Sequence, residues 1–156
     1  HECSSAASDV YKRQWLYGDW PRSGEIDLME TINTKSDELY TTVHFYDNGH
    51  RYVGGTTYLD QLTKLTNPVD HNVISLIWNE DSFQWLLNNQ LVYELYFDDL
   101  NISPNPFLEE FHMLLNVAVG GNWPGQPIAE DYCNSRINCE DVKKLIIDYV
   151  AYYRES

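Results

Sequence analysis

Three acidic residues stand close together in the segment WPRSGEIDLME, at Glu25, Asp27 and Glu30. Side chains on a β-strand alternate between its two faces, so Glu25 and Asp27 would point to the same side. Glu30 is five positions after Glu25 and would face the opposite side of a regular strand. One extra residue, accommodated as a β-bulge at Leu28 and Met29, would return Glu30 to the face of the other two acids. The spacing therefore predicts a bulged strand with three carboxyls on one face.

Two carboxyls on one face can break a glycosidic bond. Enzymes that retain the anomeric configuration hold them about 5–5.5 Å apart, one as nucleophile and one as acid and base. Four strand steps separate α-carbons by about 13 Å, so the two glutamates would lean toward each other over Asp27. Asp27 would then hydrogen-bond a neighbouring carboxyl and separate the pKa values of the two glutamates. The competing interpretation is an exposed acidic strand edge in an acidic protein.

The elements that must position these acids are short strands separated by turn residues. Strands are predicted over residues 26–32, 39–46, 73–78, 82–87 and 91–97. Asn48-Gly49 is a strong hairpin signal. The mostly apolar run 111–119 predicts a central strand buried on both faces, and residues 141–153 predict a final strand. Turn signals every 8–12 residues, without sustained helical periodicity, predict an all-β sandwich or barrel.

Composition limits the partners of the chain. Its 156 residues include 24 acidic and 10 basic side chains, which gives a formal net charge of −14. The length predicts one domain, and 43 % hydrophobic residues are enough for one core. The charge argues against nucleic acid and against an anionic membrane, because both require a basic surface. The 12 tyrosines and 5 tryptophans suit β-strands and flat neutral ligands such as sugar rings.

The N-terminal segment and the cysteines lead to further expectations. Residues 1–14 are small and polar without hydrophobic periodicity, and we interpret them as a disordered leader or non-native tail outside the fold. No run of about 18 apolar residues is present to form a transmembrane helix. Cys133 and Cys139 lie in a polar stretch and predict a loop-closing disulfide in an oxidising compartment. The alternative is a pair of free thiols in a reducing compartment.

Several segments resemble one known family. GEIDLME resembles the active-site signature of glycoside hydrolase family 16 in its bulged form, and WPRS is similar to the laminarinase branch of that family. Matching stretches follow in order between Trp15 and Tyr153: TTVHFYDNG, HNVISLIWNEDSFQWLLNNQ, FHMLLNVAVGGNWPG and IIDYVAYY. The resemblance implies a β-jelly-roll sandwich of the concanavalin A-like type, whose concave face forms a sugar-binding cleft. It also implies that a β-1,3-linked glucan is cleaved internally, with retention.

The resemblance also implies where this chain lies within such a domain. Domains of the family carry several strands before the signature, which here begins near residue 25. We therefore expect residues 15–156 to be the C-terminal part of a catalytic domain that is incomplete on its N-terminal side.

Individual roles follow from the same resemblance. It implies Glu25 as nucleophile, Asp27 as its helper and Glu30 as general acid and base. The residues expected to bind sugar are Trp20, Arg22, His44, Asn116 and Trp123. A structural alternative stands beside each of them: a core aromatic ring, a surface salt bridge, a structural histidine or a satisfied buried amide. We interpret the other two tryptophans of the middle of the chain, Trp78 and Trp85, as core residues.

A metal ion is expected only in a structural role, and no cofactor is required for the chemistry. Members of the family often hold calcium near the position of Asp148. This acid lies between Ile147 and Tyr149, so it would need a compensating cation if it were buried.

Two other functions fit the residues. A related hydrolase could act on agar, carrageenan or mixed-linkage glucan, although the bulged signature argues against typical mixed-linkage enzymes and the scarcity of basic residues against sulfated polymers. The domain could instead bind β-glucan without catalysis, although such relatives usually lose the signature glutamates. We expect a secreted monomer whose partner is a β-glucan polysaccharide, with no nucleic acid and no membrane.

Overall fold

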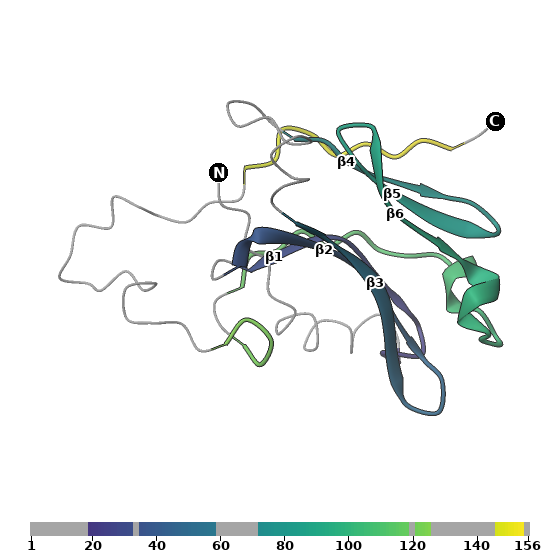
Figure 1. The fold of residues 1–156 in the computed structure, drawn as a ribbon. Helices are drawn as coiled ribbons and strands as arrows, with labels where there is room; N and C mark the ends of the chain where they lie inside the picture. Colours follow the sequence, from purple (N-terminus) through teal and green to yellow (C-terminus); the bar gives the residue numbers. More distant parts are fainter. Residues whose placement is uncertain (1–18, 33–34, 59–71, 119–120, 126–145, 155–156) are drawn as a thin grey trace.

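The computed structural model describes residues 19–32, 35–58, 72–118, 121–125 and 146–154. These residues form two three-stranded antiparallel sheets that enclose the core between them (Figure 1). The all-β prediction is confirmed. Within these ranges, none of the helices has the length and apolarity needed to span a bilayer.

The first sheet contains β1 (Glu25–Ile32), β2 (Lys35–Tyr46) and β3 (His50–Tyr58), in that order. From Leu39 onward the odd-numbered residues of β2 point into the core: Leu39, Thr41, Val43 and Phe45 are all nearly inaccessible to solvent. The even-numbered residues must therefore point away from the second sheet, because side chains alternate along a strand. This outward face, carried by β1, β2 and β3, is called the open face below.

Two features of the first sheet differ from the prediction. β2 begins at Lys35, four residues before the strand predicted over residues 39–46. β3 was not predicted as a strand, because two glycines and several polar residues interrupt any apolar pattern. It forms because the turn at Asn48 and Gly49 returns the chain along β2. A side chain at Gly54 would place its Cβ 2.2 Å from the carbonyl oxygen of Thr41, so glycine permits this close pairing.

The second sheet contains β4 (Ile74–Trp78), β5 (Ser82–Leu87) and β6 (Gln90–Tyr96), also in sequence order. These three strands match the predicted segments to within one residue at each end. Asn88 and Asn89 connect β5 to β6 with φ of 50° and 65°, the backbone that a tight two-residue hairpin turn requires.

The core lies between the two sheets and is rich in aromatic residues. Its buried members are Val43, Phe45, Phe83, Trp85, Leu95, Phe97, Leu100 and Phe107. The last three come from two short 3-10 helices, η2 (Phe97–Leu100) and η3 (Pro106–Leu108), which follow β6. Each such side chain contributes about 1.5–3 kcal/mol on burial, before the entropy of ordering is subtracted. The predicted core position is correct for Trp85 but wrong for Trp78, which is 39 % exposed.

Two strand predictions are wrong for the described residues. Residues 111–118 and 146–154, green and yellow in Figure 1, have no strand structure, and most of their apolar side chains are exposed. An apolar pattern favours burial, but by itself it does not make a strand. A strand also needs hydrogen bonds from a neighbouring strand, and no described strand pairs with either segment.

Candidate active site

The register between β1 and β2 places the three acids on the open face. Glu25 is paired with His44 and Asp27 with Thr42, both even-numbered residues of β2. The register then shifts, so that Glu30 is paired with Tyr40, another even-numbered residue. The three steps from Asp27 to Glu30 on β1 thus lie opposite the two steps from Thr42 to Tyr40 on β2. The additional residue on β1 forms a β-bulge. The bulge predicted between Asp27 and Glu30 is present, and it returns Glu30 to the side of Glu25 and Asp27.

The turn before β1 brings an indole against the first acid. Backbone hydrogen bonds from Arg22 and Ser23 to the carbonyl oxygen of Asp19 close this turn, and Gly24 leaves it with φ of 76°. The turn directs Trp20 back over the strand, where its Nε1 donates to Oε2 of Glu25 at 2.6 Å. A hydrogen bond of this kind favours the ionised form of the carboxyl.

A histidine pair continues the polar network from Asp27 toward solvent. Nε2 of His44 lies 3.2 Å from Oδ2 of Asp27, at ion-pair distance. The contact lacks hydrogen-bond geometry, and Oδ2 has no hydrogen-bond partner among the described residues. Nδ1 of His44 lies 2.8 Å from Nε2 of His50, and the two rings stack with centroids 5.0 Å apart. The ring of Trp20 packs on His50 at 4.6 Å and so completes an aromatic wall beside Glu25.

Burial governs the charge of the three acids. It is the chief cause that raises the pKa of Glu25 to about 7; the Asp27 charge acts in the same direction, while the Trp20 hydrogen bond and His44 oppose it. Burial raises the pKa of Asp27 to about 7. The pKa of Glu30 is raised to about 8, chiefly by burial and next by the charge of Asp27, against the effect of His44. Because the acids repel one another, they titrate as one coupled group.

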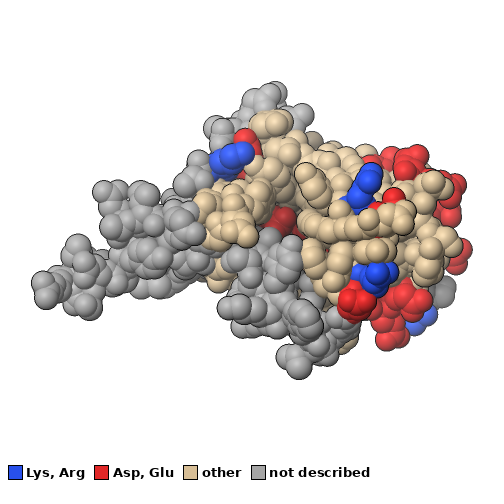
Figure 2. Space-filling view, turned by 90° about the horizontal axis from the view of Figure 1, so that it is seen from below, with Lys and Arg blue, Asp and Glu red and all other residues tan. Residues whose placement is uncertain are grey.

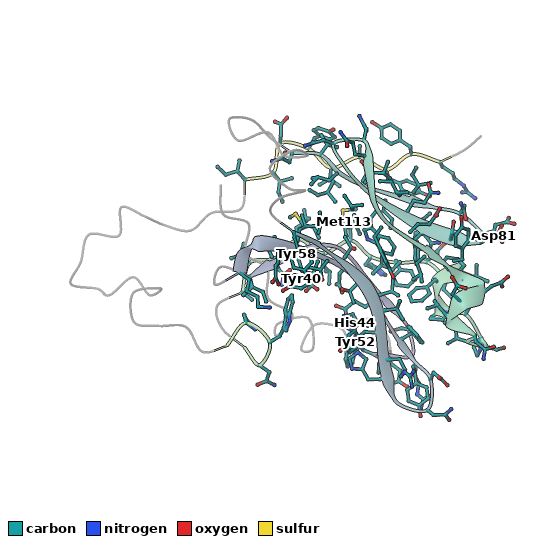
Figure 3. The ribbon with its side chains drawn as sticks, viewed as in Figure 1. Tyr40, His44, Tyr52, Tyr58, Asp81 and Met113 are labelled. Atoms are coloured by element: carbon teal, nitrogen blue, oxygen red, sulfur yellow. The ribbon has the colours of Figure 1, made fainter. Side chains whose placement is uncertain are left out.

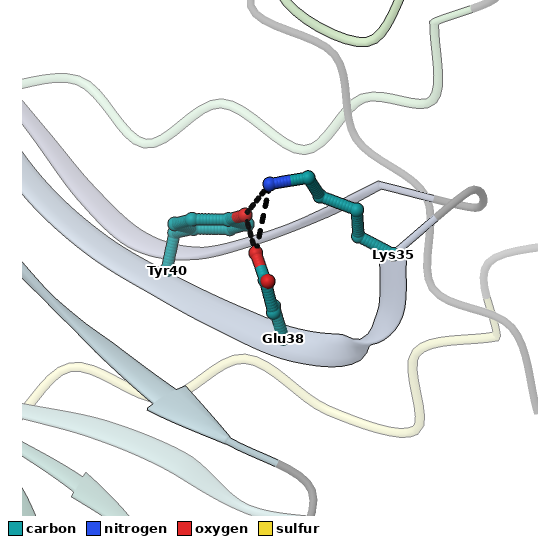
Figure 4. Close-up of polar contacts among 3 residues, drawn as sticks. All are labelled: Lys35, Glu38 and Tyr40. Atoms are coloured by element: carbon teal, nitrogen blue, oxygen red, sulfur yellow. Dashed lines mark hydrogen bonds and ion pairs between the residues drawn. The ribbon is translucent and has the colours of Figure 1, made fainter.

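Aromatic and polar side chains extend the open face beyond Glu30. Gly121 and Gly125 form two backbone hydrogen bonds with each other, at 3.1 and 3.0 Å, and so close a small turn that carries Trp123. The rings of Trp123 and Tyr40 form a T-shaped pair with centroids 4.9 Å apart. Figure 4 shows the polar contacts that join Tyr40, Glu38 and Lys35. Nζ of Lys35 lies 3.2 Å from Oε2 of Glu38 and 3.2 Å from the hydroxyl oxygen of Tyr40.

The open face therefore has aromatic groups on both sides of the acids. Trp20 stands beside Glu25 at one side, and Trp123 stands against Tyr40, the partner of Glu30, at the other. Figure 3 shows His44 and Tyr52 on the side of the first sheet that faces away from the second. Figure 2, seen from below the first sheet, shows acidic atoms at the base of a hollow. Such an arrangement can hold a flat, hydroxyl-rich ligand across carboxyls that exchange protons near neutral pH.

The remaining predicted site residues lie elsewhere or have other contacts. Arg22 forms an exposed ion pair with Asp19 at 3.2 Å, and its guanidinium lies 3.6 Å from the ring centroid of Tyr46. These contacts correspond to the surface salt bridge, the alternative interpretation of Arg22. Asn116 is half-buried in the irregular segment 111–118, and no hydrogen bond among the described residues joins it to the three acids.

The expected calcium site finds no support in the described residues. Asp148 is exposed, so burial creates no need for a cation there. Across the described ranges, no group of three histidine, cysteine or acidic side chains could hold a metal ion. Cys133 and Cys139, with the predicted leader 1–14, lie outside the described residues.

Sequence reasoning missed three residues of the open face: Tyr40, His50 and Tyr52. Tyr40 shares an alternating pattern with His44, so its position could have been inferred from the strand prediction for residues 39–46. His50 and Tyr52 follow the predicted hairpin turn and are paired with Tyr46 and His44. Extending the hairpin by its symmetry would have placed both on this face.

The sequence of the chain is similar to those of known proteins. The family model described as Glycosyl hydrolases family 16 matches residues 9–141. The clotting factor G alpha subunit of Tachypleus tridentatus is 29 % identical over 155 residues, covering 94 % of this chain and 21 % of that protein. The glucan endo-1,3-beta-glucosidase A1 of Niallia circulans is 30 % identical over 150 residues, covering 90 % of this chain and 20 % of that protein. The chain thus spans about a fifth of the length of these two relatives.

Solved structures agree with the fold. The X-ray structure of the laminarinase from Rhodothermus marinus matches with a TM-score of 0.54 and 29 % identity, over 70 % of this chain and 45 % of that chain. This likeness, together with the two packed antiparallel sheets, confirms the predicted β-jelly-roll sandwich.

Proposed function

The chain belongs to glycosyl hydrolases family 16, and we propose that it hydrolyses internal β-1,3-glucosidic bonds of a laminarin-like β-glucan with retention of configuration. The observation that carries the proposal is the bulge in β1, which sets Glu25, Asp27 and Glu30 on one open face. Retaining hydrolysis needs two carboxyls that flank the scissile bond of the substrate, and no metal or organic cofactor is needed for it.

Glu30 is the general acid and base in this proposal. Its pKa of about 8 keeps it protonated at neutral pH, as a proton donor must be before reaction. Glu30 gives its proton to the glycosidic oxygen as the bond from that oxygen to the anomeric carbon breaks. In the second half of the reaction it takes a proton from water, and this water releases the sugar from the enzyme.

Glu25 is the nucleophile. Its carboxylate attacks the anomeric carbon and forms a glycosyl ester, which the activated water then hydrolyses. The hydrogen bond from Trp20 and the nearby His44 both lower the pKa of Glu25 and so favour the ionised form that attacks. The adjacent Asp27 is buried and holds a proton more readily than an ordinary aspartate. In its protonated form it can donate a hydrogen bond to a neighbouring carboxylate without adding negative charge.

A neutral glucan is the substrate class that the open face favours. The flat rings of Trp20 and Trp123 are suited to stack on sugar faces at either side of the carboxyls. The formal charge of −14 would repel sulfated chains. Two matched proteins carry the names glucan endo-1,3-beta-glucosidase and laminarinase.

The decisive experiment incubates the chain with laminarin and follows new reducing ends, with proton NMR to read the anomeric form of the first product. We expect β-configured product to appear first and to convert to the α form later. Parallel incubations with mixed-linkage glucan, agarose and carrageenan test the other substrates. Cleavage of one of these polymers but not of laminarin would assign that polymer as the substrate. A first-formed α product would overturn the retaining mechanism. Binding to insoluble β-glucan with no cleavage of any polymer would indicate a binding module.

A further inference from the structure

One hydrogen bond ties the second sheet to the strand that carries the acids. Nε1 of Trp85, on β5, donates to the backbone carbonyl oxygen of Asp27, on β1, at 3.1 Å. The two residues are 58 positions apart in the sequence. We propose that Trp85 is a positioning residue: its indole N–H holds the β1 bulge in the conformation that keeps Glu30 on the open face beside Glu25.

The accepting carbonyl lies where the strand first departs from regular pairing. The β1–β2 register is regular from Glu25 to Asp27 and shifts immediately after Asp27. A bulge disrupts the ladder of interstrand hydrogen bonds, so its backbone conformation depends on contacts from elsewhere. Without the extra residue, Glu30 would turn to the core side of the sheet. A donor fixed at the Asp27 carbonyl therefore acts on the one feature that places all three carboxyls together.

The donor is held firmly by its surroundings. Trp85 is fully buried, and its ring packs against Phe83 and Tyr93 with centroids 5.4 and 5.5 Å apart. A side chain packed in this way has few alternative rotamers, so the position of its N–H is set by the core of the second sheet. The core of the second sheet thereby fixes a backbone atom of the strand that carries the acids.

The molecule contains a matched control for this bond. Trp78, on the neighbouring strand β4, donates from its Nε1 to the carbonyl oxygen of Phe107 at 3.0 Å. Phe107 lies in η3 and its side chain is beside Gly24, three residues before the register shift that follows Asp27. Trp78→Phe therefore removes an indole–carbonyl bond of the same kind without touching the bulge, whereas Trp85→Phe removes the one at Asp27. Both substitutions keep an aromatic ring.

The test measures the ionisation of the acids directly. Carbon-13 NMR of the side-chain carboxyls gives the pKa of Glu25, Asp27 and Glu30 in the wild-type chain and in each variant. The charged groups facing Glu30 are Asp27, His44 and Glu25, so a movement of the bulge changes its pKa. We expect the pKa of Glu30 to move by about 0.5 or more in Trp85→Phe and to stay within about 0.2 in Trp78→Phe.

A kinetic measurement provides a second test, which rests on the proposed function and is interpreted separately from the NMR titration. On laminarin, we expect kcat of Trp85→Phe to fall by about tenfold to a hundredfold with KM within about twofold, because the acids are displaced while the sugar-binding rings remain. Trp78→Phe should keep both constants within about twofold. A wild-type chain that cleaves nothing would contradict the proposed function, while the NMR titration would still decide the role of Trp85.

Two results would overturn the inference. One is an unchanged set of carboxyl pKa values in folded Trp85→Phe. The other is an equal change in both tryptophan variants, which would indicate a general loss of packing. If Trp85→Phe does not fold, 3-benzothienylalanine introduced at position 85 keeps the shape of the indole and replaces only its N–H by sulfur. The same two outcomes then apply to that variant.

Discussion

The indole nitrogen of Trp20 lies 2.6 Å from Oε2 of Glu25 and donates a hydrogen bond to it. Trp20 belongs to the turn before β1 and is five positions before Glu25 in the sequence. A short segment of chain therefore places the donor beside the acceptor. This bond lowers the pKa of a carboxyl that burial and the charge of Asp27 raise. Glu25 thus remains easier to ionise than Glu30, whose pKa of about 8 has no such opposing hydrogen bond among its causes. The different tasks proposed for the two glutamates correspond to this difference.

Replacing either glutamate should abolish laminarin cleavage. We expect Glu25→Gln and Glu30→Gln each to lose roughly 10³-fold or more in kcat, because one removes the nucleophile and the other the proton donor. Glu38→Gln is the control, since this glutamate contacts Lys35 and Tyr40 on the same sheet. Substantial activity in either active-site variant would contradict the assignment.

The two roles can be told apart by chemical rescue. With an aryl β-glycoside and azide, Glu25→Ala should form the α-glycosyl azide, because azide attacks in place of the missing carboxylate. Glu30→Ala should form the β-glycosyl azide, because azide attacks the glycosyl ester already made by Glu25. Product configuration is read by proton NMR. The reverse pair of products would exchange the two assignments.

Removing the indole N–H at position 20 should move the pH profile. Trp20→Phe takes away a hydrogen bond that favours ionised Glu25, so the pKa of this acid rises further. Because Glu25 attacks in its ionised form, the acid limb of kcat/KM should move to higher pH, and kcat/KM at pH 6 should fall by about tenfold. Trp123→Phe, at the other side of the acids, should leave that limb in place. An acid limb that stays unmoved in Trp20→Phe would show that the bond does not tune Glu25.

Trp123 should contribute to substrate binding more than to the chemical step. Its side chain is 43 % exposed and rests on Tyr40 beyond Glu30. We expect Trp123→Ala to raise KM for laminarin by roughly threefold to tenfold with little change in kcat, and Trp123→Phe to lose less. A fall in kcat at constant KM would instead indicate that this ring acts on the reacting bond.

Stability should decrease as the pH rises from about 5 to 8. The three acids have folded-state pKa values of about 7 to 8, above the ordinary values of 3.8 for aspartate and 4.5 for glutamate. The folded chain therefore holds more protons than the unfolded chain in this range, and the free energy of unfolding falls with rising pH. One pKa unit corresponds to about 1.4 kcal/mol, so we expect a loss of roughly 2 kcal/mol or more, measured by urea unfolding.

Two variants distinguish the effect of these buried acids on the pH dependence of stability from the effect of exposed acids. Glu30→Gln removes a group with a strongly raised pKa and should flatten the dependence of stability on pH. Glu80→Gln, at an exposed glutamate, should leave the slope nearly as it is. Equal slopes in both variants would show that Glu30 titrates as an ordinary surface acid.

Much of the site could be inferred from local rules. Period-two alternation and the five-residue spacing between Glu25 and Glu30 were enough to predict the bulge, because a strand has only two faces. The same rules failed for β3, where Gly54 and Gly55 carry no apolar signal. Its pairing depends on the close approach of Gly54 to Thr41, and this contact is visible only when both strands are in place.

The sequence by itself determined the all-β class, the strands of the second sheet and the acids that share a face. Each of these depends on residue type and on spacing along a few neighbouring residues. Tertiary structure alone decided that segments 111–118 and 146–154 are not strands, because hydrogen bonds to a neighbour are not encoded in an apolar pattern. It also decided the burial that raises the acid pKa values, and the bond from Trp85 to Asp27. That bond joins two residues distant in the chain that meet only when the two sheets pack.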